Sequence, residues 1–126
     1  ITLIEGDSIA ANTIARVRSL IGEGETVLVF LDSNHSKAHV LAELHAYAAF
    51  VREGGYIVVA DGAMPEFVGL PGAHPDSALD NPGAAIAAFV EANDAFERVP
   101  PPRPFDESSV PEMPSYWPNG YLRRVR

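Results

Sequence analysis

Short apolar runs divide the chain into alternating segments. These runs consist mainly of β-branched and aromatic residues, which favour β-strands. The predicted strands are Ile1–Ile4, Thr26–Leu31, Tyr56–Ala60, Phe96–Val99 and Tyr121–Val125. Thr26–Leu31 and Tyr56–Ala60 are apolar on both faces, which is typical of central strands in a parallel sheet with helices on both sides. We therefore expect these two strands to form the middle of such a sheet.

Between these runs, apolar residues recur with the 3.6-residue period of an α-helix. Each periodic stretch begins at a residue that favours the helix N-cap position. The predicted caps are Ser8, Ser36 and Asn81, and the helices continue to Ile21, Val51 and Asn93. The order β-α-β-α-β-α-β-β predicts an α/β domain with right-handed crossovers and a parallel sheet, in which the last two strands run antiparallel.

Two long segments carry no sustained period. Residues 62–81 contain repeated prolines and glycines next to a predicted strand end, so we expect a functional loop or lid there. Residues 100–118 hold most of the prolines and are predicted to form a Pro-rich loop. The length of 126 residues fits a single domain over residues 1–126.

The composition narrows the classes of function. With 17 acidic against 9 basic residues, the formal charge of −8 repels a phosphate backbone, so no nucleic-acid partner is expected. No apolar run approaches the roughly 20 residues that span a bilayer, and no signal-peptide core precedes the charged residues. We expect a cytoplasmic protein with no membrane partner. The sequence has no initiator Met and begins within a predicted strand, so we expect it to be the C-terminal part of a longer protein.

Aspartates follow the ends of the first three predicted strands. They are Asp7, Asp32 and Asp61. Ligands of an open parallel sheet bind outside the carboxyl ends of its strands, so these acids should face one crevice, where Asp32 and Asp61 can share a divalent cation such as Mg²⁺. The alternative is that each aspartate only caps a turn. The absence of cysteine leaves carboxylates, histidines and hydroxyls to carry any chemistry.

His35 follows Asp32 by three residues and lies on the same predicted rim. Histidine accepts a proton near neutral pH, which makes it a candidate general base. The alternative is a histidine that only caps the helix N-terminus or faces solvent. His39 and Glu43 continue a four-residue spacing from His35, a pattern found in metal-binding helices. The signal is weak, and Glu43 is expected to be an ordinary solvated residue.

The chain resembles the cephalosporin hydroxylase family in a set of short segments. These segments are Ile4–Ser8, Leu31–Lys37, His39–Leu44 and Gly54–Val59. The family consists largely of S-adenosylmethionine-dependent, Mg²⁺-assisted O-methyltransferases, including enzymes that act on rhamnose and on macrolide sugars. The resemblance spans about residues 1–99 and resumes at 119–125.

The resemblance implies a Rossmann-like class I methyltransferase sheet, of which this chain supplies the C-terminal portion, strands three to seven. It implies S-adenosylmethionine and Mg²⁺ as cofactors, with His35 as the catalytic base and Asp32 and Asp61 as metal ligands. It further implies a cofactor site, with the turn after the first strand at the adenine. The implied cofactor residues are Gly6, Asp7, Ser8, Asp32 and Ser33. The sequence departs from the family's Glu-Asp pair at Ala60-Asp61, which removes one carboxylate.

The implied substrate is a small molecule that bears a hydroxyl, such as a sugar or natural product, and we expect a homo-oligomer. Two other classes of function stay open. The first is a non-catalytic scaffold for an oligomer, in which the change to Ala60 has abolished metal binding. The second is a metal-assisted hydrolase that uses the same carboxylate rim.

Overall fold

The computed structural model describes residues 1–101, 115 and 117–126. Most of the predicted Pro-rich loop at 100–118 lies outside the described residues. Within the described part of the chain, no helix has the length and apolar character required to cross a membrane.

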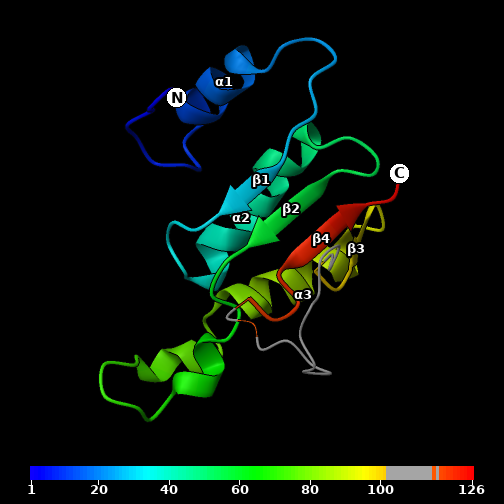
Figure 1. The fold of residues 1–126 in the computed structure, drawn as a ribbon. Helices are drawn as coiled ribbons and strands as arrows, with labels where there is room; N and C mark the ends of the chain where they lie inside the picture. Colours follow the sequence, from blue (N-terminus) through cyan, green and yellow to red (C-terminus); the bar gives the residue numbers. More distant parts are fainter. Residues whose placement is uncertain (102–114, 116) are drawn as a thin grey trace.

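A four-stranded sheet forms the centre of the fold (Figure 1). Its strands are β1 (Val29–Leu31), β2 (Tyr56–Val59), β3 (Phe96–Arg98) and β4 (Tyr121–Arg124), in the order β1-β2-β4-β3. β1 and β2 are parallel, whereas β4 lies between β2 and β3 and runs antiparallel to both. The mixed α/β fold and the antiparallel final pair were both predicted, and the fold is consistent with a methyltransferase-like domain.

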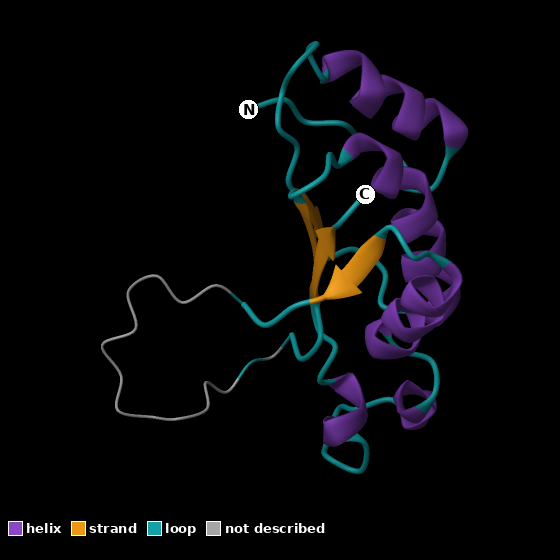
Figure 2. Ribbon diagram, turned by 90° about the vertical axis from the view of Figure 1, so that its right-hand side faces the viewer, coloured by secondary structure: helices purple, strands orange, loops and turns teal. Residues whose placement is uncertain are grey.

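Two helices cover one face of the sheet. They are α2 (Lys37–Tyr47), which connects β1 to β2, and α3 (Pro82–Ala92), which connects β2 to β3. Right-handed crossovers between strands that run in the same direction place successive helices on the same side, and both lie together on that side in Figure 2. The third helix, α1 (Ala11–Leu20), lies beyond β1 and packs Ile14 and Val17 against the core.

The core fills the space between the sheet and the two covering helices. Its fully buried side chains come from both layers: Leu44, Ile57, Ile86, Phe89 and Leu122. Ile57 is the cross-strand neighbour of Val29 on one side and of Leu122 on the other, so one row of side chains crosses three strands under the helices. Aromatic packing of Phe89 on Phe96, with ring centroids 5.5 Å apart, extends this core to the last strand pair.

Two of the predicted helix caps are confirmed and one is wrong. The Ser36 side chain accepts a hydrogen bond from the backbone N–H of His39 at the start of α2, and Asn81 accepts one from Ala84 at the start of α3. Ser8 does not cap α1, which begins after Ala10 with no side-chain cap. The Ser8 hydroxyl instead hydrogen-bonds His39, 31 residues later in the chain.

The prediction of a strand at Ile1–Ile4 is wrong. These residues form no strand, and Ile1 and Leu3 are exposed. A strand requires hydrogen bonds to a neighbouring strand, and among the described residues none lies beside this segment. The sheet therefore holds four strands, and the numbering of strands three to seven implied by the resemblance is not confirmed.

The central position predicted for the second apolar run is also wrong. Its strand is shorter than predicted, Val29–Leu31 against Thr26–Leu31, and it forms the edge of the sheet. Leu28 is 66% exposed and Phe30 48%, with the Phe30 ring packed edge-on against Trp117. The described helices lie on one side of the sheet, and the other side carries none of them (Figure 2). The apolar run at Thr26–Leu31 thus predicted a strand correctly. It could not show whether both faces of that strand are covered by other parts of the chain.

The predicted loop at 62–81 contains two short 3₁₀ helices that were not predicted, η2 (Met64–Phe67) and η3 (Pro75–Ala78). Proline lies in the first turn of each, where its fixed φ angle suits a helical start. This segment continues from the carboxyl end of β2 and projects away from the sheet (Figure 1). It returns at Asp80, whose carboxylate accepts a hydrogen bond from the Lys37 N–H at the start of α2.

Candidate functional site

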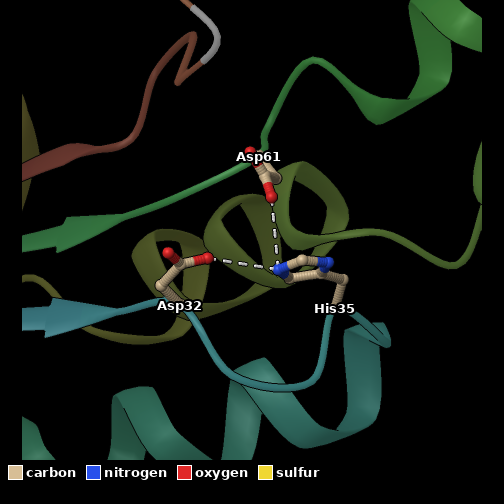
Figure 3. Close-up of side chains that lie close together, drawn as sticks. All are labelled: Asp32, His35 and Asp61. Atoms are coloured by element: carbon tan, nitrogen blue, oxygen red, sulfur yellow. Dashed lines mark hydrogen bonds and ion pairs between the residues drawn. The ribbon is translucent and has the colours of Figure 1, made fainter.

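Three side chains predicted to carry chemistry converge at the carboxyl ends of β1 and β2 (Figure 3). The Nε2 atom of His35 lies 3.4 Å from Oδ1 of Asp32 and 3.3 Å from Oδ2 of Asp61. Each of the three residues offers one possible ligand atom, and these three atoms all lie within 4.8 Å of one another. The aspartates that follow these two neighbouring strands therefore lie close together.

The backbone explains why these groups meet. The two parallel strands stay paired up to the rim, where the Ala60 N–H donates to the carbonyl of Leu31 at 2.9 Å. Asp32 follows that carbonyl directly, and Asp61 follows Ala60. Asp61 has a positive φ of 56°, a left-handed conformation that aspartate adopts more readily than most residues. Its carboxylate points toward His35, as Figure 3 shows.

His35 lies in the loop that precedes α2. Asn34 shapes this loop, because its side-chain oxygen accepts a hydrogen bond from the Ser36 N–H at 2.8 Å. Ser36 then caps the helix. His35 is therefore not part of the helical face that holds His39 and Glu43, as the weakness of the four-residue spacing signal already indicated.

The donor set suits a hard divalent cation. The carboxylates of Asp32 and Asp61 both lie close to the His35 imidazole. They repel each other, and a positive charge between them relieves this repulsion. The side chains of Asp32, His35 and Asp61 are 54%, 34% and 40% exposed, so water or substrate oxygens can reach the same point. These residues therefore fit Mg²⁺ through two carboxylate oxygens, with further coordination positions open.

Ala60 stands where the resemblance implied a second carboxylate at the end of β2. Its side chain is 2% exposed. A glutamate at this position would have to displace neighbouring atoms before its carboxylate reached the Asp32–Asp61 pair. Because the resemblance implies a metal ligand at this position, we expect a carboxylate there to strengthen metal binding, and this stays a prediction.

The third predicted acid, Asp7, does not join the pair. Its Oδ1 atom accepts a hydrogen bond from the Ile9 N–H at 3.1 Å, which stabilises the turn before α1. The preceding Gly6 has a φ of 151°, and an added Cβ would lie 2.8 Å from the Thr13 hydroxyl oxygen. Both residues therefore shape the turn that carries Ser8.

A cavity of about 340 Å³ connects this turn to the rim of β1. It is lined by Ser8, Val29, Phe30, Leu31, Asp32, Ser33, Glu43 and Tyr47. Its volume is at the lower end of the roughly 300–1,000 Å³ typical of small-molecule sites. Three of the predicted cofactor residues, Ser8, Asp32 and Ser33, thus share one cavity.

Sequence reasoning missed the polar residues on the α2 side of this cavity. Glu43 was expected to be solvated but is 2% exposed, and its Oε1 atom accepts a hydrogen bond from the Ser33 hydroxyl at 2.7 Å. The Tyr47 hydroxyl donates to the Ser8 carbonyl at 2.8 Å. Burial, followed by the negative charges of Glu43 and Asp7, raises the pKa of Tyr47 above its ordinary value, so the phenol stays a proton donor. The spacing of His39, Glu43 and Tyr47 along one helical face was the available signal.

The comparison with known families bears on this site. The sequence matches the family described as rhamnosyl O-methyltransferase/CmcI over residues 1–125. Comparison with curated proteins gave no match. Comparison with solved structures also gave none. Because this match covers nearly the whole chain, the chain belongs to the rhamnosyl O-methyltransferase/CmcI family, also called the cephalosporin hydroxylase family.

Proposed function

We propose that the protein is an O-methyltransferase that takes its methyl group from S-adenosylmethionine and uses Mg²⁺ to methylate a hydroxyl of a sugar or other natural product. Membership of the family supports methyl transfer. The methyl donor, the metal and the class of acceptor are the parts that this proposal adds.

One observation carries the proposal: the His35 imidazole lies between the Asp32 and Asp61 carboxylates, next to the cavity that Ser8 and Ser33 line. A methyltransferase of this kind needs a proton acceptor, a place for a cation and a donor site side by side. The described chain has a histidine, two carboxylates and a cavity at one end of the sheet, and we assign these three roles to them.

Mg²⁺ held by Asp32 and Asp61 would lower the pKa of an acceptor hydroxyl and hold its oxygen toward the methyl donor. His35 would remove the proton from that hydroxyl and hold it on Nε2. The oxygen would form a bond to the methyl carbon as the bond between that carbon and the sulfonium sulfur breaks, which would leave the donor as a neutral thioether.

The geometry suits His35 as the base. Its Nε2 atom lies 3.4 Å from Oδ1 of Asp32 and 3.3 Å from Oδ2 of Asp61, so the two aspartates orient the ring toward the point where they meet. The 34% exposure of its side chain leaves a path for an incoming hydroxyl. Both distances are longer than a short hydrogen bond, as is common for catalytic groups before substrate binds.

The cavity suits the methyl donor. Its wall combines the apolar side chains of β1 with the Ser8 and Ser33 hydroxyls, so it offers both an apolar surface and hydrogen-bonding groups. Gly6 and Asp7 shape the turn that holds Ser8. We assign this turn to the adenosine end of the donor and Asp32 and Ser33 to the end nearer the reacting methyl.

The test is methyl transfer by the intact protein to a panel of hydroxyl-bearing sugars and phenols. His35→Ala is expected to lower kcat by roughly 10²–10⁴-fold, because a general base contributes during proton transfer. The affinity for S-adenosylhomocysteine should stay nearly unchanged. His45→Ala is the matched control, since His45 is an exposed histidine of α2 outside the cluster, and it should retain the wild-type rate.

An unchanged kcat in His35→Ala would remove His35 from the role of base. Failure of the wild-type protein to methylate any acceptor of the panel would contradict the proposed function and favour the scaffold.

A further inference from the structure

Glu43 combines two features that rarely occur together. It is 2% exposed within the α2 helix, and among the described residues its Oε2 atom is the buried side-chain atom that has no hydrogen-bond partner. A buried carboxylate oxygen without a donor destabilises a folded protein, because it has lost its water and gained nothing in exchange. An apolar side chain of similar size would avoid this loss, so the stability of the fold does not explain a glutamate here.

The partner of the other oxygen points to a different role. Oε1 of Glu43 accepts a hydrogen bond from Ser33 at 2.7 Å, across ten residues of sequence. Ser33 directly follows Asp32 and lies two residues before His35, at the start of the loop that carries the acidic rim. A charge-assisted hydrogen bond of this kind is among the stronger anchors available to a side chain. Glu43 therefore fixes this loop to α2.

Neighbouring residues on the same helical face anchor a second loop. His39 is one turn before Glu43, and its Nε2 atom lies 2.9 Å from the Ser8 hydroxyl and 3.6 Å from Oε1 of Glu43. Tyr47 is one turn after Glu43 and donates to the Ser8 carbonyl. Glu43 thus lies at the centre of a polar row on α2 that contacts the Ser8 turn and the Asp32–His35 loop at once.

We propose that Glu43 is a positioning residue for the metal site, retained at a loss of stability because it holds Ser33 and thereby the Asp32 carboxylate in place. The inference rests on the proposed function only in that a cation binds at Asp32 and Asp61. Glu43 lies outside the group of Asp32, His35 and Asp61, so it would not itself be a ligand of the cation. Residues that hold metal ligands in this way commonly change metal affinity by roughly 10–100-fold when they are replaced.

The experiment measures metal affinity and thermal stability on the same variants of the intact protein. Mn²⁺ is the probe, because free and bound Mn²⁺ differ in their electron paramagnetic resonance signal. Glu43→Leu is expected to weaken Mn²⁺ binding by roughly 10–100-fold while Tm stays equal or rises. Glu43→Gln keeps a hydrogen-bonding partner for Ser33 and should retain most of the affinity.

Three further variants separate positioning from general damage. Ser33→Ala removes the other half of the hydrogen bond and should weaken Mn²⁺ binding to a similar extent, and the double variant should lose little more than either single one. Glu91→Leu replaces an exposed glutamate of α3 and should leave the affinity unchanged.

The outcomes distinguish the two proposals. Wild-type Mn²⁺ affinity in Glu43→Leu or in Ser33→Ala contradicts the positioning role while leaving the proposed function intact. A large fall in Tm for Glu43→Leu contradicts the stability argument, and Ser33→Ala then decides the positioning role alone. A wild-type protein that binds no Mn²⁺ contradicts the metal site itself, and with it both proposals.

Discussion

At the scale of single residues, neighbours decide what a side chain does. Tyr47 occupies an apolar position of the helical period and is 9% exposed, yet its hydroxyl anchors the Ser8 turn. Its pKa is raised first by burial and then by the carboxylates of Glu43 and Asp7. A tyrosine with a raised pKa in the folded state binds its proton more tightly there than in the unfolded chain, which couples stability to pH.

The sign of this coupling gives a prediction. The stabilisation is fully present below the ordinary pKa of 10.0 and is lost as pH rises through the higher pKa of the folded state. Tyr47→Phe lacks the titrating group, and the loss of one hydrogen bond should lower its free energy of unfolding near pH 7 by about 0.5–1.5 kcal/mol. The difference from wild type should shrink above about pH 10. Urea unfolding of both proteins at pH 7 and pH 10.5 measures this difference in the free energy of unfolding. A difference that is the same at both pH values would contradict the raised pKa of Tyr47.

At the scale of elements, the helix starts were the best-predicted features. Ser36 and Asn81 both cap as expected, because a cap depends on local sequence and on the first turn that follows it. The predicted cap of α1 was wrong because the Ser8 hydroxyl hydrogen-bonds His39 instead. No local sequence pattern indicates that contact. Strand positions were less predictable, because strands form only where a neighbour exists to receive their hydrogen bonds.

The two confirmed caps differ in strength. Asn81 is 3% exposed and makes two side-chain bonds of 2.9 Å, from the Ala84 N–H to its oxygen and from its amide to the Ser77 carbonyl. The Ser36 bond is longer, at 3.4 Å. Asn81→Ala should therefore lower the free energy of unfolding by about 2 kcal/mol, and Ser36→Ala by less. Thermal unfolding of both variants tests this, and equal losses would show that cap geometry does not set the difference.

At the scale of the whole molecule, the sequence predicted the α/β class and the acidic rim but not the polar row beneath it. Asp32 and Asp61 could be paired because each follows an apolar run and parallel strands end at one edge. The place of His35 between them depends on the Asn34 turn and on the left-handed backbone of Asp61. The burial of Glu43 depends on the approach of Ser33 from another element, which periodicity along a single helix cannot reveal.

The open side of the sheet was likewise beyond sequence reasoning. Leu28 and Phe30 are as apolar as the buried residues of β2, yet they are exposed at the edge strand. Periodicity and apolar character report that a segment can pair and pack. They do not report which partners lie next to it, so the run at Thr26–Leu31 was predicted as central and the one at Ile1–Ile4 as a strand.

The central claim is that the cavity beside the acidic rim binds S-adenosylmethionine as a methyl donor. Calorimetric titration of the intact protein with this cofactor tests it most directly, because the measurement needs no knowledge of the methyl acceptor. We predict saturable binding with a dissociation constant on the order of 1 μM to 1 mM, the range in which enzymes usually bind their substrates. Folded protein that gives no saturable heat with S-adenosylmethionine, with or without Mg²⁺, would contradict the account.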